Sequence, residues 1–146
     1  MTEMPNDTLA VDRPPVRPRG FSRPFWEATR EKRLLLQYDP VAERYQFFPR
    51  PVSIYTGRRN LEWREVSGRG SVFSYTLARR GRGPFRGSEP YLVATVTLDQ
   101  GVNVVANLVH VATDAVEIGM RVRPVWAPLP DGFHLLMFEP AAEPTA

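Results

Sequence analysis

The stretch Tyr91-Leu-Val-Ala-Thr-Val-Thr-Leu98, Asp99-Gln-Gly101, Val102-Asn-Val-Val-Ala-Asn-Leu-Val109 carries the clearest structural signal in this chain. Its two valine-rich runs flank a short polar segment that ends in glycine, which is typical of a tight β-hairpin. Three similar runs lie around it, at residues 71–78, 121–126 and 133–138. Five short strands with glycine-containing turns predict a small barrel. An OB-fold is the best candidate, and an SH3-like barrel or a partial sandwich is the alternative.

By composition the chain divides into four segments. Residues 1–20 are polar and proline-rich, which predicts a disordered or extended arm. Residues 21–66 predict a short helix followed by a small, aromatic-rich β unit, and residues 67–140 predict the barrel. Residues 141–146 are expected to form a flexible tail. The fold class is therefore mainly β, with one short helix near the N-terminus.

The small unit is predicted from local signals. Ser22 is expected to cap a helix over residues 24–32, with Pro24 in its first turn. Apolar runs at residues 34–38, 44–48 and 61–65, separated by polar segments, predict its strands.

Composition excludes several classes of protein. The 146 residues include no cysteine, so disulfides, a thiolate nucleophile and cysteine-bound zinc are excluded. The sequence contains no apolar run of roughly 20 residues, so no membrane span is expected. The N-terminus carries no secretory signal, so we expect a cytoplasmic protein. The net charge of +3 comes almost wholly from arginine and is a weak indication of anionic partners.

Several short motifs, taken in order, resemble a known family. They are Arg23-Pro-Phe-Trp26, Phe48-Pro-Arg-Pro51, Pro90-Tyr-Leu-Val-Ala94, Val104-Val-Ala-Asn-Leu-Val109, Val116-Glu-Ile-Gly-Met-Arg-Val122 and a last strand within residues 132–140. Together they resemble the family called domain of unknown function 35 (DUF35), in which a rubredoxin-like zinc ribbon precedes an OB-fold. The similarity covers about residues 20–140.

The resemblance implies a ribbon that has lost its metal ligands. Family members carry two C-x-x-C pairs around an aromatic-Pro-Arg element, which is Phe48-Pro-Arg50 in this chain. The four ligand positions then fall at or near Asp39, Ala42, Ser53 and Thr56. None is a thiolate and alanine binds no metal, so we expect no zinc. We therefore expect aromatic packing to replace the folding energy that a structural zinc supplies.

The aromatic side chains of the ribbon-like segment have two interpretations. They could form a small core of their own, or they could form a partner-binding face. The candidate interface residues are Tyr38, Tyr45, Phe48, Tyr55 and Trp63.

The segment between the first two barrel strands is the candidate ligand site. Four arginines (Arg79, Arg80, Arg82 and Arg86) are interspersed with glycines and Phe85. Guanidinium groups suit phosphate oxygens, and OB-folds use this position for recognition. The segment could contact the nucleotide end of coenzyme A or an acidic partner; alternatively, its arginines are simply solvated.

Three classes of function follow, and the first is the expected one. No nucleophile-base arrangement, phosphate loop or dinucleotide motif occurs in the sequence, so no catalytic residue is assigned. The resemblance implies a non-catalytic assembly subunit that binds a thiolase-like or lipid-transfer-protein-like enzyme and helps form its acyl-CoA site. Such enzymes act in steroid side-chain, polyketide or lipid metabolism, and an enoyl-CoA hydratase-like or dehydrogenase chain is a further partner that the family implies. The alternatives are a single-stranded nucleic-acid binder and an enzyme in its own right.

Overall fold

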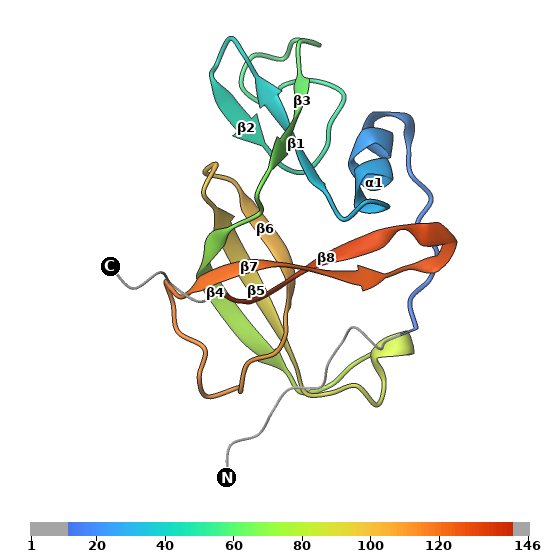
Figure 1. Ribbon diagram of the computed structural model, residues 1–146, viewed down its shortest axis with the longest axis vertical. Helices are drawn as coiled ribbons and strands as arrows, with labels where there is room; N and C mark the ends of the chain where they lie inside the picture. Colours follow the sequence, from blue (N-terminus) through green and yellow to red (C-terminus); the bar gives the residue numbers. More distant parts are fainter. Residues whose placement is uncertain (1–11, 142–146) are drawn as a thin grey trace.

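The computed structural model describes residues 12–141, which form two stacked β units (Figure 1). A small three-stranded sheet lies at one end of the molecule, and a five-stranded barrel forms the larger part. One short helix, α1, lies beside both. Residues 1–11 of the predicted arm (1–20) and residues 142–146 of the predicted tail (141–146) lie outside the described residues.

The small unit begins with a 3-10 turn, η2 (Gly20–Ser22), which leads into α1 (Arg23–Thr29). Its sheet has the strand order β2-β1-β3, with β1 (Leu34–Asp39) in the centre, β2 (Arg44–Gln46) and β3 (Glu62–Val66). Both neighbours pair antiparallel to β1. The short helix and the small sheet of this unit were both expected from the sequence.

The barrel has the strand order of an OB-fold. Its strands are β4 (Gly70–Ala78), β5 (Tyr91–Leu98), β6 (Asn103–Leu108), β7 (Arg121–Pro128) and β8 (His134–Pro140). They close in the order β4-β5-β6-β8-β7, and short 3-10 turns, η3 (Gly83–Phe85) and η4 (Pro130–Gly132), lie in the connections. This topology confirms the predicted OB-fold. The β5–β6 turn contains Gly101 at a φ of 87°, as its sequence predicts.

One apolar core joins the two units. Alternate residues of β5 point into the barrel, and Leu92 and Val96 are almost completely buried there. The same cluster includes Phe25 of α1 and Leu36 of β1. The helix thus packs between the small sheet and the barrel, and it places the aromatic residues of both units close together.

The predicted helix start and end need correction. Ser22 occupies the N-cap position, but its hydroxyl does not cap α1: it exchanges hydrogen bonds with the backbone of Arg19 instead. The helix ends at Thr29 rather than at residue 32, because the chain turns at Lys32, which has a φ of 57°. The Thr29 hydroxyl bonds to the Trp26 carbonyl in this last turn.

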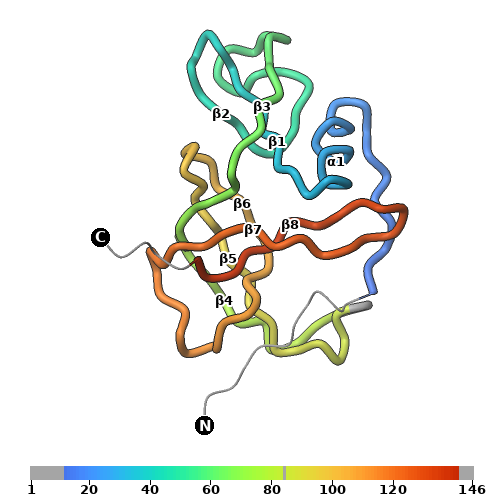
Figure 2. The backbone as a smooth tube through the Cα atoms, in the orientation of Figure 1, coloured from blue at the N-terminus to red at the C-terminus, as the bar shows by residue number. Residues whose placement is uncertain are grey.

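The N-terminal part of the described chain is irregular from residue 12 to residue 19. Figure 2 shows this blue segment leading up to α1. Arg13 is nevertheless buried, with its guanidinium 5.9 Å from the centre of the Phe85 ring. No helix in residues 12–141 has the length and apolar character that crossing a membrane requires.

Candidate functional site

Asp39, at the end of β1, is a fully buried hydrogen-bond acceptor. Its Oδ2 accepts from the hydroxyls of Ser53 at 2.5 Å and Thr56 at 3.0 Å. Its Oδ1 accepts from the backbone N–H groups of Val41 at 2.8 Å and Ala42 at 3.1 Å. The Ser53 hydroxyl first, and then these N–H groups, outweigh burial and hold the pKa of the Asp39 carboxyl well below its usual range. Asp39 is therefore a buried carboxylate at neutral pH.

The hydrogen-bonded group lies at the positions that the resemblance predicts for the zinc ligands of the family. Here these positions supply one carboxylate, two hydroxyls that donate to it, and a methyl group at Ala42. Zinc needs four nitrogen, sulfur or carboxylate ligands directed at one point. These residues do not fit zinc. Within residues 12–141, no cluster of three or more His, Asp or Glu is suited to a metal ion.

Two buried amides extend the polar interior. The side chains of Gln37 and Gln46 bond to each other at 2.9 Å, and Gln37 also bonds both backbone groups of Arg50. Gln46 accepts from the N–H of Ile54 at 2.9 Å. These bonds hold the long loop between β2 and β3 against β1. A buried polar network therefore ties these loops in addition to the aromatic packing, and the replacement of zinc's folding energy by that packing stays a prediction.

Three of the predicted interface residues gather around one hollow. Tyr38, Tyr45 and Tyr55 line a polar hollow of about 450 Å³ together with Arg44 and Arg64. The Arg64 guanidinium stacks 3.6 Å from the Tyr38 ring centre, and that of Arg44 lies 4.2 Å from the Tyr55 ring centre. The Tyr55 hydroxyl donates to the Tyr45 carbonyl at 2.6 Å. These contacts order the three tyrosines on the side of the small sheet that faces the β5–β6 turn, where Gln100 and Gly101 also line the hollow.

The other two predicted interface residues lie elsewhere. Trp63 packs against the common core and lines a different hollow, beside Gln37 and Pro51. Phe48 is 58% exposed and lies next to Phe47, close to the barrel. The five aromatic residues therefore do not form one continuous face.

The predicted ligand-binding arginines lie together on one exposed loop. All four side chains (Arg79, Arg80, Arg82 and Arg86) are exposed, and none forms a salt bridge with a described residue. Phe85 is half-buried, with its ring 5.4 Å from that of Tyr91. The Glu89 carboxylate accepts from the N–H of Gly81 at 2.9 Å, and this bond lowers the pKa of Glu89. The loop is thus folded on itself and directs its cationic groups outward.

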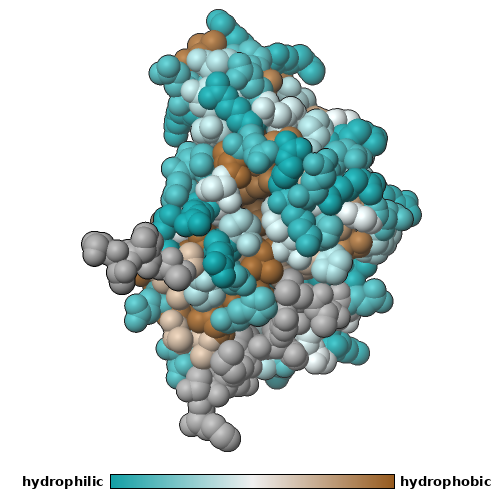
Figure 3. All heavy atoms as spheres, viewed as in Figure 1, coloured by the Kyte–Doolittle hydropathy of each residue, from teal (hydrophilic) through white to brown (hydrophobic). Residues whose placement is uncertain are grey.

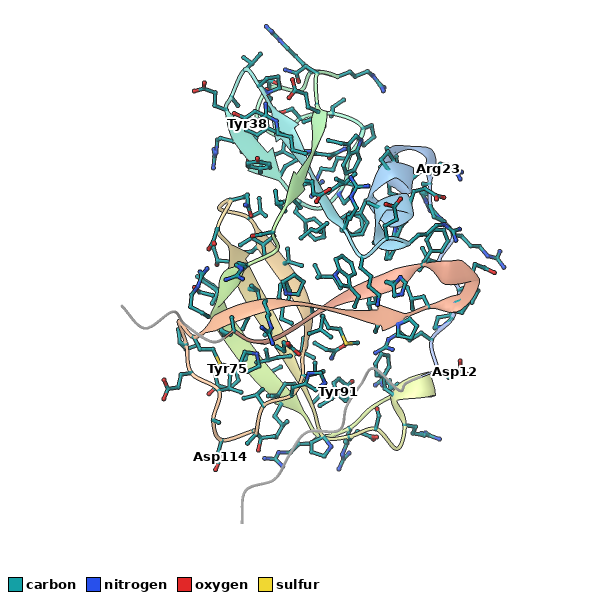
Figure 4. The ribbon with its side chains drawn as sticks, in the orientation of Figure 1. Asp12, Arg23, Tyr38, Tyr75, Tyr91 and Asp114 are labelled. Atoms are coloured by element: carbon teal, nitrogen blue, oxygen red, sulfur yellow. The ribbon has the colours of Figure 1, made fainter. Side chains whose placement is uncertain are left out.

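An apolar groove separates this loop from the small unit. Its larger part, about 520 Å³, is bounded by α1, the Phe47–Phe48 pair, β6 and β8. A second part of about 270 Å³ continues along β6 and β8 to Phe85 and Tyr91. Figure 4 shows Tyr91 at the end of the barrel away from Tyr38, so the groove and the tyrosine hollow are separate features. Apolar side chains also reach the surface between the two units on the face that Figure 3 shows.

The described histidines make structural contacts. The Nδ1 atom of His110 lies 2.7 Å from Glu139, and that of His134 lies 2.8 Å from the backbone carbonyl of Thr29. Neither belongs to the groove or to the arginine loop.

Sequence reasoning missed two features that these sites depend on. One is the hydrogen bonding around Asp39; its signal was the presence of hydroxyl residues at two of the lost ligand positions. The other is Val105, which is 68% exposed in the middle of β6. Its signal was the break in alternation at Val104-Val105, where an apolar residue takes an outward position.

Comparisons with known proteins agree with this architecture. The family model of the ChsH2 C-terminal OB-fold domain matches residues 63–127. The chain is 33% identical over 109 residues to a DUF35 domain-containing scaffold protein of Pyrococcus furiosus, covering 75% of this chain and 79% of that protein. It is 33% identical over 143 residues to a probable enoyl-CoA hydratase alpha subunit of Thermomonospora curvata, covering 94% of this chain. The chain spans only 44% of that relative's length.

A solved structure extends the similarity to the whole fold. A chain of the Ltp2-ChsH2(DUF35) aldolase superposes with a TM-score of 0.77 and 32% sequence identity, covering 89% of this chain and 100% of that chain. The shared region includes both β units. This chain therefore belongs to the DUF35 family.

Proposed function

We propose that this chain is a non-catalytic accessory subunit of an acyl-CoA-processing enzyme. Its partner would be a thiolase-like enzyme of the lipid-transfer-protein type, which supplies the catalytic groups. The observation that carries the proposal is the similarity to the full length of a chain from the Ltp2-ChsH2(DUF35) aldolase. The scaffold protein of Pyrococcus furiosus, similar over three quarters of this chain, supports the same role.

The surface chemistry supports a division of labour between the two chains. The arginine loop presents four exposed guanidinium groups, which suit the phosphates of coenzyme A. The groove beside it is apolar and suits contact with a protein partner. In this arrangement the partner holds the acyl group and this chain contacts the nucleotide end of the same ligand. The probable hydratase relative makes a hydratase-like chain a second candidate partner.

Co-expression with an Ltp2-like aldolase from the same organism tests the proposal. We expect the two chains to co-elute from size-exclusion chromatography, and aldol cleavage of an acyl-CoA to require both. Recovery of this chain as a free monomer, with no response to coenzyme A, would contradict the proposal. Turnover of an acyl-CoA by this chain alone would contradict the non-catalytic assignment.

Paired arginine variants test the ligand contact. Arg80→Ala/Arg82→Ala removes two charges from the loop, whereas Arg58→Ala/Arg59→Ala removes two exposed charges from the small unit. Each lost phosphate contact is a charge-assisted bond, so we expect the loop variant to raise the KM for acyl-CoA about tenfold or more. The control pair should leave KM within about twofold. Equal effects of both pairs would show a general charge effect instead of a site.

A further inference from the structure

The seam of the barrel between β6 and β8 is incomplete. The two strands pair only at Leu108 and Phe138, where the N–H of Val109 donates to the Phe138 carbonyl at 2.9 Å. Within residues 12–141, no strand pairs with residues 103–107 on the side away from β5. The first half of β8 likewise pairs only with β7 in this part of the chain. The facing edges of β6 and β8 are therefore paired at Leu108 and Phe138 and are not paired with each other beyond that point.

The register of β6 shows which backbone groups face the seam. In an antiparallel pair, every second residue turns its N–H and C=O toward the partner strand. The N–H of Leu98 donates to the Val102 carbonyl at 2.9 Å, so the even-numbered residues of β6 bond to β5. The backbone groups of Asn103 and Val105 therefore point away from β5, into the seam.

The facing edge on β8 is open over a shorter stretch. The N–H of Leu129 donates to the Phe133 carbonyl at 2.8 Å, so the odd-numbered residues of β8 bond to β7. Leu136 then directs its N–H and C=O into the seam. The N–H of His134 is the next one that points into the seam, and it donates to the Thr29 hydroxyl at 3.1 Å. Helix α1 thus limits the open stretch at this end.

The apolar groove lies along this seam. Both of its parts are lined by Val105 and by Leu135 and Leu136 of β8. Arg50 is the one charged residue among the described residues that line it, and no carboxylate lines it. The arginine loop follows at the far end, next to Phe85. The groove therefore combines unpaired backbone edges, apolar walls and positive charge at both ends.

We infer that an extended segment of the partner enzyme adds a β-strand to the open edge of β6. This inference rests on the proposed function and specifies the contact within it. Strand addition satisfies outward N–H and C=O groups, and alternate side chains of the added strand fill apolar pockets. The edge of residues 103–107 is long enough for a strand of about four or five residues. Charge complementarity assigns an acidic residue to the flank of that segment that lies at Arg50.

An acyl chain in the groove would leave a different pattern of hydrogen bonds. It would cover the apolar walls, but it carries no backbone donor or acceptor for Asn103 and Val105. The seam has such groups on both walls, so a polypeptide satisfies more of it than a lipid does.

Amide hydrogen exchange distinguishes the occupants residue by residue. In the free chain, the amides of residues 104 and 106 should exchange slowly, because they bond to β5, and those of Asn103 and Val105 should exchange fast. In the co-expressed complex with the Ltp2-like aldolase, we expect exchange at residues 103 and 105 to slow by about 100-fold or more. The amides of residues 104 and 106 serve as internal controls.

Each outcome decides the inference. If a complex forms and residues 103 and 105 exchange as fast as before, strand addition is wrong and the accessory role stands. If no complex forms, the proposed function fails together with the inference. Protection of both amides in the isolated chain, with light scattering that reports a dimer, would assign the edge to a second copy and overturn the inference. Palmitoyl-CoA alone could change the amide exchange of Leu135 and Leu136 while the amide of residue 105 still exchanges fast in the complex. That result would assign the groove to a lipid and overturn the inference.

Two variants of one residue provide a second test. Val105→Pro removes the outward N–H, which the fold itself does not use, and should weaken the complex about tenfold or more. Val105→Thr keeps the N–H and the shape while losing apolar character, and should weaken it less than about threefold. The reverse order of effects would indicate an apolar contact without strand pairing. Unchanged β5–β6 amide signals establish that the proline variant is folded; if it is not, the exchange experiment on the natural chain decides.

Discussion

The two β units of this protein are stabilised by opposite means. The barrel buries an apolar interior, with Val96, Val122 and Phe138 fully enclosed. The small unit contributes Leu36 to that core but also buries polar groups: Asp39, Gln37 and Gln46 lie in its interior and bond to its loops. A barrel of long strands forms its own apolar core, whereas a unit of three short strands and long loops has too little apolar area. Directed hydrogen bonds fix its loops at the positions where the resemblance predicts the metal of the family.

Introducing cysteines at the four predicted ligand positions should have the largest effect on how the small unit is stabilised. The variant Asp39→Cys/Ala42→Cys/Ser53→Cys/Thr56→Cys places thiols at positions whose side chains or backbone already converge. We expect one zinc per chain and a small unit whose folding depends on it, since structural zinc contributes on the order of 10 kcal/mol to such units. Metal analysis and melting with and without a chelator measure this. A variant that binds no zinc would show that the register assigned to the ligand positions is wrong.

Truncation in the barrel core should be the next largest effect. Phe138→Ala removes a fully buried ring next to the β6–β8 closure and should lower the free energy of unfolding by about 3–5 kcal/mol. Denaturant unfolding followed by circular dichroism measures the loss. Because the core is shared with Phe25 and Leu36, both units should unfold together. Two separated transitions would contradict a common core.

Removing the buried carboxylate should act mainly on the small unit. Asp39→Ala leaves the hydroxyls of Ser53 and Thr56 without their acceptor in a buried site. We expect the melting temperature to fall by about 10 °C and the loop at residues 47–61 to lose amide protection first. The β5–β6 amides should remain protected below the transition. Glu43→Ala, an exposed acidic residue of the same unit, is the matched control and should change little.

Acid should destabilise the small unit by protonating the Asp39 carboxylate. At moderate pH this effect should be smaller than that of removing the carboxylate by mutation. Because the pKa of Asp39 is lowered by folding, its contribution is fully present above the ordinary Asp pKa and is lost as pH falls below about 4. Asp99 behaves likewise, since Arg121 lowers its pKa. The measurement is therefore the difference between the natural chain and Asp39→Asn. The natural chain should lose more stability between about pH 5 and 2, and parallel curves would contradict the assignment.

The parts of the fold that the sequence predicted are those with regular periodicity. The β5–β6 hairpin was predicted because alternating residues and a glycine turn act locally, and Gly101 adopts the expected conformation. The prediction that Ser22 caps the helix was wrong because the backbone of Ser22 is itself helical, with φ −100° and ψ −4°. Its hydroxyl therefore bonds back to Arg19. Helix capping depends on that backbone angle, which the residue type alone does not determine.

The candidate sites were less predictable, because they depend on contacts between distant residues. The arginine loop was identified from composition, and its four arginines do lie together on the surface. The partners of Asp39 come from 14 and 17 residues further along the chain, so their convergence on one carboxylate required the fold. The seam at Val105 depends on where β8 leaves β6, which no local pattern of β6 contains.

The carboxylate at the centre of the small unit also changes what this protein needs from its surroundings. A ribbon built on thiolates folds only when a metal is delivered, and it is lost when peroxide oxidises the sulfur atoms. At positions 39, 42, 53 and 56 this chain offers no sulfur for peroxide to oxidise. Oxidation should therefore leave this unit folded, and acidity becomes the condition that loosens it.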